Sequence, residues 1–263
     1  MTVWCNGQLL SIESARIDPR DRGFTLGDGL YETIRVQGGR LLRLDRHFAR
    51  LGEGLKLLDI RLKVDENALT GAMLSVLKAD NLTGDAVLRL TVSRGVAARG
   101  MAVDPTARPT VVISAAPFAA PGPARVMVST VTRRNAASPI SRVKTISCLD
   151  SILARQEATR NGADDAILLN GDGWVAEATA ANIFAVIDGV LVTPPIRDGA
   201  LPGVMRAAVM SHLPLGECSL SVDDLARAGE IFLTSSLGIR PVTGFEAKPL
   251  PVGPIATRLM EEL

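Results

Sequence analysis

The residues of this chain that most suggest chemistry are the amine of Lys144 and the carboxylate of Glu177. Lys144 lies in RVKTIS, residues 142–147, between a proline-containing turn and a helix-like stretch, and Glu177 lies in VAEATAANIF, residues 175–184. A lysine amine can form a Schiff base with a carbonyl group and can act as a general base, and a carboxylate can keep a ring nitrogen protonated. Taken alone, either residue is more commonly a solvated charge, so the interpretation depends on the segments around them.

The composition excludes several classes of protein. With 263 residues, 47% of them hydrophobic, the chain can bury a sizeable core, and because only 3% are aromatic that core is mainly aliphatic. A net charge of +1 and scattered basic residues argue against a nucleic-acid surface. The N-terminal residues show no signal-peptide pattern, and no apolar run is long enough to span a membrane.

The cysteines and histidines indicate neither a disulfide framework nor a metal site. Cys5, Cys148 and Cys218 are odd in number and widely separated, which is typical of free thiols in a reducing cytoplasm. The two histidines, His47 and His212, lack metal-ligand spacing, so we expect no zinc site and no other metal. The expected location is therefore cytoplasmic.

Strand and helix signals alternate along the chain. Hydrophobic periodicity and turn residues predict helices over 45–58, 65–79, 148–161 and 204–213. Strands are predicted at residues 4–10 (two short strands about a turn), 87–92, 110–114, 125–130, 166–170, 174–186 and 230–234. This mixture predicts an α+β or mixed α/β fold.

A proline-rich segment divides the chain into two predicted domains. APFAAPGP, residues 116–123, contains three prolines and a glycine and is predicted to be the interdomain linker. The smaller N-terminal α/β domain is then 1–115. The larger C-terminal domain is 124–263 and carries Lys144.

RDRGFTLGDGLYETIR, residues 20–35, resembles the N-terminal signature of the fold-type IV (class IV) pyridoxal phosphate (PLP) enzymes. That family includes branched-chain and D-amino-acid aminotransferases and aminodeoxychorismate lyase. Taken alone, the segment could be a glycine-rich turn that leads into a strand. Further segments follow in the family's order, however, so the resemblance covers nearly the whole chain and implies a two-domain fold of this type.

The resemblance implies a set of cofactor-binding residues. Lys144 would form the Schiff base with PLP and Glu177 would hold the ring nitrogen protonated. Arg50 in HFARL would bind the phosphate through its forked guanidinium. Further phosphate contacts would come from the backbone at a helix start and from a late hydroxyl, and a leucine would pack against the ring; these residues are Gly203, Val204, Met205, Ser235 and Leu201.

Two reactions stay open within this family. An aminotransferase would move an amino group between a small amino acid or amine and a 2-oxo acid, its two small-molecule partners, and we take this as the main hypothesis because it is the commonest activity of the scaffold. A 4-amino-4-deoxychorismate lyase, which releases pyruvate and 4-aminobenzoate, is the alternative. The segments SRGVAARG, residues 93–100, and SLGIRPV, residues 236–242, resemble the lyase branch, whereas Tyr31 lies where related transaminases carry an aromatic residue.

Candidate substrate-binding residues follow from the same resemblance. They are Tyr31, Arg99, Ser236 and Arg240. For Arg99 and Arg240 the alternative is a simple role in loop solubility. The family is usually homodimeric, which implies a second copy of the chain as partner, and we expect neither a nucleic-acid nor a membrane partner. A non-catalytic PLP-storage protein would be expected to lack the lysine or the carboxylate, and the glycine-rich loop at 23–29 lacks the pattern of a nucleotide-binding motif.

Overall fold

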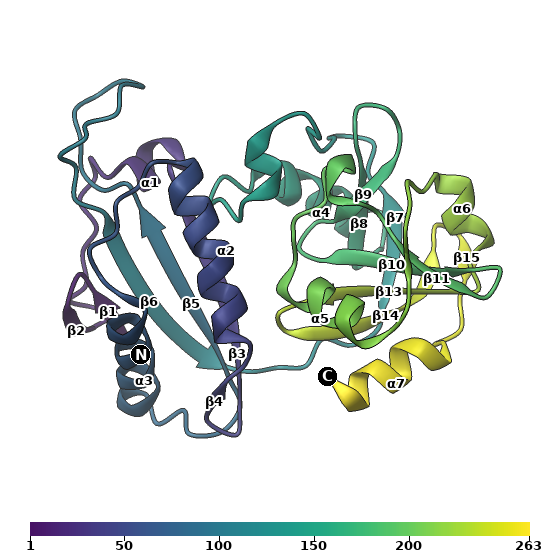
Figure 1. Ribbon diagram of the computed structural model, residues 1–263, viewed down its shortest axis with the longest axis horizontal. Helices are drawn as coiled ribbons and strands as arrows, with labels where there is room; N and C mark the ends of the chain where they lie inside the picture. Colours follow the sequence, from purple (N-terminus) through teal and green to yellow (C-terminus); the bar gives the residue numbers. More distant parts are fainter. The chain divides into compact units, whose positions relative to one another are not determined.

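The computed structural model describes residues 1–263, which form two compact units (Figure 1). The first unit contains Met1–Ala119 and Val143–Ser147, and the second contains Ala120–Arg142 and Cys148–Leu263. The segment that carries Lys144 therefore belongs to the first unit, although it falls within the predicted domain 124–263. The physical reason is backbone pairing, because Ile146 N donates to Gly29 O at 3.1 Å and Tyr31 N donates to Lys144 O at 2.9 Å.

The first unit is built on a six-stranded antiparallel sheet in the order β2-β1-β6-β5-β3-β4. Its strands are β1 (Thr2–Cys5), β2 (Gln8–Ser11), β3 (Gly29–Gln37), β4 (Arg40–Leu41), β5 (Ala86–Ser93) and β6 (Thr110–Pro117). Apolar residues alternate along the central strands, so one face is buried. The proline at the end of β6 pairs with Ala86, so this strand extends two residues into the predicted 116–123 linker, where we had expected no regular structure.

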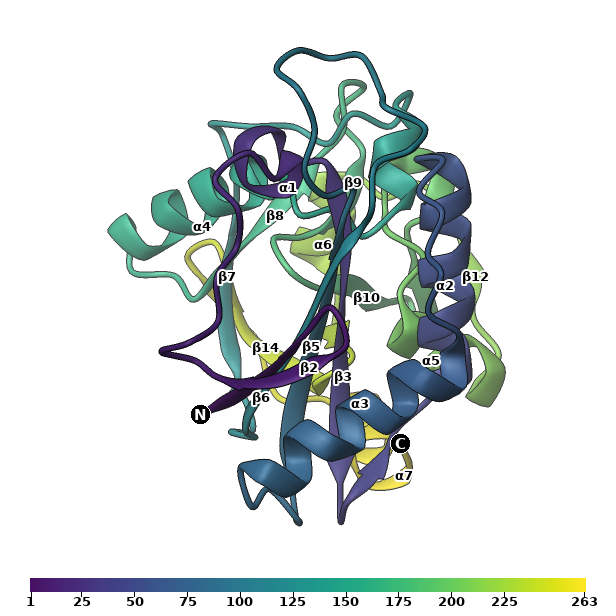
Figure 2. The same cartoon turned by 90° about the vertical axis from the view of Figure 1, so that its left-hand side faces the viewer.

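Two long helices cover the buried face of this sheet, α2 (Leu44–Leu57) and α3 (Glu66–Ala79) (Figure 2). In α2 the apolar residues recur at helical spacing, and Phe48 and Leu51 are buried against Ile34 and Val36 of β3. The side chain of Asp65 caps α3 by accepting from Ala68 N. A short helix, α1 (Arg22–Leu26), precedes β3 and is capped by Asp21.

The second unit contains a nine-stranded mixed sheet in the order β12-β11-β10-β13-β14-β7-β8-β9, with β15 paired to β14. Its strands are β7 (Ala124–Val128), β8 (Asp165–Leu169), β9 (Val175–Ala178), β10 (Asn182–Ile187), β11 (Val190–Thr193), β12 (Gly216–Glu217), β13 (Glu230–Ser235), β14 (Gly238–Phe245) and β15 (Lys248–Pro249). Its helices are α4 (Leu149–Arg160), α5 (Val204–His212), α6 (Val222–Arg227) and α7 (Pro254–Glu262), with 3-10 helices η1 (Pro139–Arg142) and η2 (Ile196–Asp198).

Helices α5 and α7 share a core with β10 and β13. Phe184 and Phe232 face each other in the sheet and stack with ring centroids 5.1 Å apart. Met205 and Val209 of α5 pack against them, as does Leu259 of α7. This packing fixes the N-terminal end of α5 beside the strands that carry the predicted cofactor residues.

The single strand predicted over 174–186 is wrong in one respect, because the structure contains two strands, β9 and β10, with a turn at 179–181. The hydroxyl of Thr179 donates to Asp165 Oδ1 at 2.6 Å and accepts from Arg155. Ala178 N donates to Ala181 O at 2.8 Å, which closes the turn. The apolar residues on both sides gave no sign of this break. Separately, no helix of the structure has the length and apolarity needed to cross a membrane.

Glu230 is expected to anchor the C-terminal helix α7. This buried carboxylate accepts from Ala256 N at 2.6 Å and from Ile255 N at 3.2 Å. We expect Glu230→Ala to lower the free energy of unfolding by about 1–3 kcal/mol, because one buried and one partly buried N–H group lose their acceptor. Urea unfolding and hydrogen exchange at residues 255–256 measure this. Glu261→Ala, at an exposed position of the same helix, is the control, and equal effects of the two changes would contradict the anchoring role.

Candidate active site

Lys144 is the only lysine of the chain that is not exposed to solvent. Lys56, Lys63, Lys78 and Lys248 are all exposed, whereas Lys144 is half-buried. Its segment pairs with the start of β3, as described above, and its Nζ lies 4.4 Å from the centroid of the Tyr31 ring. Two residues predicted for the site, Lys144 and Tyr31, are therefore brought together within the first unit.

The structure adds Arg89 to this group. Its guanidinium carbon lies 3.9 Å from the centroid of the Tyr31 ring. The register pairs Tyr31 with Thr91, and Arg89, two positions away on β5, faces the same side of the sheet. Arg89 is not among the residues predicted from the sequence. Arg89 lies on the outward-facing positions of β5, where a charged residue is ordinary, so the alternation gave no signal of its neighbours.

On the opposite face of β3, Arg50 is held by a buried carboxylate. Glu32, 1% exposed, accepts from Arg50 Nε at 2.8 Å and from Arg50 Nη2 at 2.5 Å. His47 Nδ1 lies 2.7 Å from the same carboxylate. Burial opposes ionisation of Glu32, but the hydrogen bonds from His47 and Arg50 outweigh it and hold its pKa below the ordinary value of 4.5. Glu32 thus fixes the side chain predicted to bind phosphate.

In the second unit, Glu177 is a buried carboxylate that contacts donors from three residues. Its Oε1 lies 3.1 Å from Nη2 of Arg134. Its Oε2 accepts from Leu201 N at 2.9 Å and from Asn182 Nδ2 at 3.3 Å. Only 8% of Glu177 is exposed, so these contacts compensate for the loss of hydration.

Hydrogen bonds from Asn182 connect this carboxylate to the segment at the start of α5. Asn182 Nδ2 also donates to Leu201 O at 2.8 Å. A Cβ on Gly203 would lie 1.9 Å from Asn182 Oδ1, so no larger residue fits there without displacing Asn182. Gly203 is the N-cap of α5 and provides no side-chain cap for the N–H groups of the first turn, to which Val204 and Met205 belong.

The hydroxyl of Thr234 was missed by the sequence analysis. Thr234 pairs with Asn182 in the sheet, so both side chains face α5. Its Oγ1 is buried and has no hydrogen-bond partner in the structure. The predicted phosphate ligand, Ser235, instead accepts from Leu237 N at 3.2 Å, and Ser236 occupies the turn between β13 and β14. An anionic group such as a phosphate could bind here. It would accept from the buried hydroxyl of Thr234 and from the uncapped N–H groups of α5, and Gly203 would leave space for it.

The two arginines predicted to bind substrate have different surroundings. Arg99 is exposed in the loop between β5 and β6. Arg240 is half-buried on β14, and its Nε donates to Gly122 O at 2.6 Å while its Nη2 lies 3.4 Å from Pro123 O. Arg240 therefore has a structural role in holding the segment that leads into β7.

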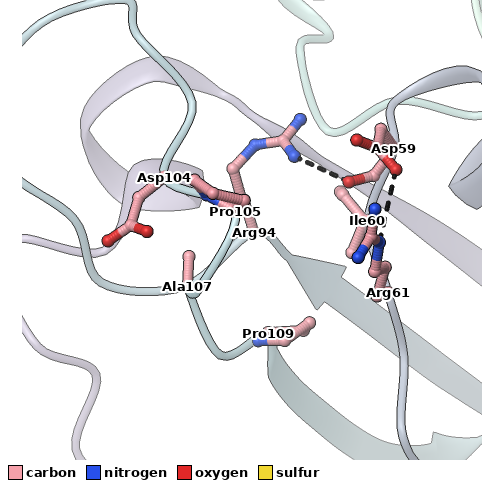
Figure 3. A pocket seen from close by; sticks show the side chains of 8 residues that line it. All are labelled: Asp59, Ile60, Arg61, Arg94, Asp104, Pro105, Ala107 and Pro109. Carbon is pink, nitrogen blue, oxygen red and sulfur yellow. Dashed lines mark hydrogen bonds and ion pairs between the residues drawn. The ribbon is translucent and has the colours of Figure 1, made fainter.

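A pocket in the first unit involves none of the predicted site residues (Figure 3). It is lined by Asp59, Ile60, Arg61, Arg94, Asp104, Pro105, Ala107 and Pro109. The buried Arg94 forms an ion pair with Asp28 and donates to Leu58 O at 2.7 Å, so its guanidinium is used in intramolecular contacts. No cluster of three or more metal-ligating side chains was found.

Residues 29–245 match the family described as amino-transferase class IV, and the chain therefore belongs to this family. A protein of Methanocaldococcus jannaschii assigned as a branched-chain-amino-acid aminotransferase is 32% identical, covering 100% of this chain and 95% of the relative. A D-alanine aminotransferase of Bacillus licheniformis is 31% identical, covering 96% of this chain and 91% of the relative.

Solved structures of the family superimpose closely on this chain. The branched-chain aminotransferase of Thermoproteus uzoniensis with norvaline has a TM-score of 0.93 and 29% identity, covering 100% of this chain and 93% of its own. The 4-amino-4-deoxychorismate lyase of Pseudomonas aeruginosa has a TM-score of 0.86 and 32% identity, with coverages of 99% and 97%. The T.th. branched-chain aminotransferase with pyridoxamine 5'-phosphate has a TM-score of 0.91 and 26% identity, with coverages of 99% and 92%.

These matches confirm the predicted family and the fold-type IV architecture. They also confirm the prediction of a PLP-dependent aminotransferase, because the matched family is that of the class IV aminotransferases. The individual site residues stay predictions, to which the geometry adds Arg89, Arg134, Asn182 and Thr234 as neighbours.

Removing the charge of Glu32 is expected to change the acid sensitivity of the protein. Because its pKa is depressed in the folded state, its contribution is complete above the ordinary value of 4.5 and is lost as the pH falls from there through the folded-state pKa. Glu32→Gln is therefore expected to cost about 3 kcal/mol near neutral pH, where Arg50 loses its buried partner, and to flatten the loss of stability in acid. Urea unfolding at several pH values measures both effects.

Glu53→Gln changes an exposed glutamate on the same helix as Arg50 and serves as the matched control. If Glu32→Gln and Glu53→Gln show the same stability and the same pH profile, Glu32 does not hold Arg50.

Proposed function

We propose that this class IV aminotransferase transfers an amino group between a small amino acid or amine and a 2-oxo acid, with PLP attached to Lys144. The assignment of residues rests mainly on a set of hydrogen bonds in the second unit. There, a buried carboxylate, Glu177, is linked through Leu201 and Asn182 to the uncapped start of α5. A carboxylate for the ring nitrogen and an anion site for the phosphate are the two anchors that PLP needs.

The bound cofactor supplies an electron sink that stabilises negative charge at the substrate carbon. In our proposal, the amine of Lys144 forms the covalent link to the cofactor and, once released by the substrate amine, acts as the general base at that carbon. Glu177 keeps the ring nitrogen protonated. Leu201 packs against the ring.

Several groups are proposed to bind the phosphate. Arg50 supplies a charged, forked donor that is already oriented by Glu32. Gly203 allows close approach to the N–H groups of Val204 and Met205. Ser235 is the predicted hydroxyl ligand, and the unpartnered Oγ1 of Thr234 supports Thr234 as a second one.

We propose that a substrate carboxylate is recognised beside Tyr31. The guanidinium of Arg89 lies against the same ring as the amine of Lys144, so a carboxylate bound by Arg89 would lie near the reacting amine. Arg99 and Ser236 are further candidates from the sequence. Arg240 stays a candidate only if its bonds to the 122–123 carbonyls are exchanged for substrate.

The lyase is the second candidate function. The lyase of Pseudomonas aeruginosa is as similar in sequence, at 32% identity, as the aminotransferase relatives. The same lysine, carboxylate and phosphate site would serve both reactions, so these residues do not separate them.

We also propose that the protein is a cytoplasmic homodimer. None of the three cysteines, Cys5, Cys148 and Cys218, forms a disulfide, which supports a reducing compartment. Exposed apolar side chains support a second copy as partner, since such groups are commonly covered in oligomers. They include Phe24 and Met101 in the first unit and Leu149 in the second.

Half-reaction spectroscopy tests the proposed reaction. The holoprotein is mixed with single D-amino acids, L-amino acids and (R)-amines, and its absorbance is followed. Conversion of the lysine-bound cofactor into pyridoxamine phosphate, with a 2-oxo acid released, is the expected result for at least one amino acid. Release of pyruvate and 4-aminobenzoate from aminodeoxychorismate, without conversion by any amine, would contradict the aminotransferase and support the lyase.

A further inference from the structure

Arg134 connects three separate segments of the second unit through one guanidinium. Its Nη2 lies 3.1 Å from Glu177 Oε1 on β9. The same nitrogen donates to Ser141 O in η1 at 2.9 Å, and Nε donates to Gly199 O at 3.1 Å, just after η2. Arginine can make these contacts together because its donors are held in one plane.

The backbone of Arg134 is itself fixed, so the side chain starts from a defined position. Arg134 N donates to Leu169 O at 2.8 Å at the end of β8. Gly199 adopts a left-handed φ of +102°, and a Cβ there would lie 3.2 Å from the Cβ of Arg134. The close approach of these two residues therefore depends on the glycine.

Glu177 and the segment before α5 are thus held by the same side chain. Gly199 lies two residues before Leu201, whose N–H donates to the other oxygen of Glu177. Arg134 therefore orients the carboxylate from one side and the backbone that binds it from the other. A lysine at position 134 would keep the positive charge but would lose the planar set of guanidinium donors that binds all three segments.

We propose that Arg134 is a positioning residue that fixes Glu177 relative to the start of α5. This inference rests on the proposed function, because it assigns Glu177 to the ring nitrogen of PLP and the start of α5 to the phosphate. Arg134 keeps these two anchors at a constant separation. The role differs from that of a catalytic residue, because Arg134 acts through Glu177.

The test compares Arg134→Gln, Arg134→Lys and Arg133→Gln. Arg133 is the matched control, because it is the exposed neighbour and donates only to the nearby carbonyls of Ser129 and Thr132. Three quantities are measured: hydrogen exchange at the Leu201 amide, the affinity of the apoprotein for PLP, and the pH midpoint of the absorbance of the holoprotein.

For Arg134→Gln we expect faster exchange at Leu201 and PLP affinity lower by about tenfold or more, since a charge-assisted contact is lost. The pH midpoint of the holoprotein absorbance should move upward by roughly one unit. The variant loses a positive charge, whereas Leu201 N and Asn182 still hold the negative charge of Glu177, and a more negative surrounding favours the protonated form. Arg134→Lys should keep the wild-type midpoint but show faster exchange at Leu201. Arg133→Gln should match the wild type in all three quantities.

A double variant separates positioning from a general structural effect. In a Glu177→Gln background, Arg134→Gln should cause a smaller further loss of PLP affinity than in the wild type, because only its contacts to the Ser141 and Gly199 carbonyls are then left to lose. Additive losses, or an Arg134→Gln protein that behaves as Arg133→Gln does, would overturn the inference. Failure of the proposed function would look different, because the wild-type holoprotein would then convert no amino acid or amine in the half-reaction, while exchange at Leu201 in the apoprotein would still report whether Arg134 holds this segment.

Discussion

The buried carboxylate of Glu177 needs hydrogen-bond donors to replace its lost hydration, and this requirement fixes the positions of the other candidate site residues in the second unit. A charge that is 8% exposed needs donors to replace its hydration, and here they come from Arg134, Asn182 and the backbone of Leu201. These donors lie on different segments, so satisfying one side chain fixes the positions of several. The position of the start of α5 follows from the same contacts, because Asn182 also binds Leu201 O and lies against Gly203.

The first unit uses the same physical principle for a cation. Arg50 is half-buried, and its orientation is set by the more deeply buried Glu32. Strand β3 then separates two kinds of residue by simple alternation. Glu32 faces the helices that cover the sheet, whereas Tyr31 faces the other side with Arg89 and Lys144. A single strand thus carries a residue that orients the proposed phosphate ligand and a residue beside the proposed Schiff-base lysine.

Much of the fold could be predicted from the sequence because its signals are local. The apolar spacing of Leu44, Phe48 and Leu51 gave helix α2, and the family resemblance gave Lys144 and Glu177 as candidates. The roles of Arg89, Arg134 and Thr234 depend on strand register and on contacts between distant segments, which no local pattern contains. The break in the predicted 174–186 strand was missed for the same reason, because Asp165 stabilises the turn from another strand.

Borohydride reduction of the holoprotein, followed by peptide mapping, tests the central claim most directly. The chain has five lysines, of which Lys144 is half-buried and the other four are exposed, and peptide mapping distinguishes them. The account predicts one pyridoxyl group, on the peptide that contains Lys144, and none in a Lys144→Ala variant. A pyridoxyl group on Lys56, Lys63, Lys78 or Lys248 instead, or a holoprotein whose cofactor is not fixed by reduction, would contradict the account.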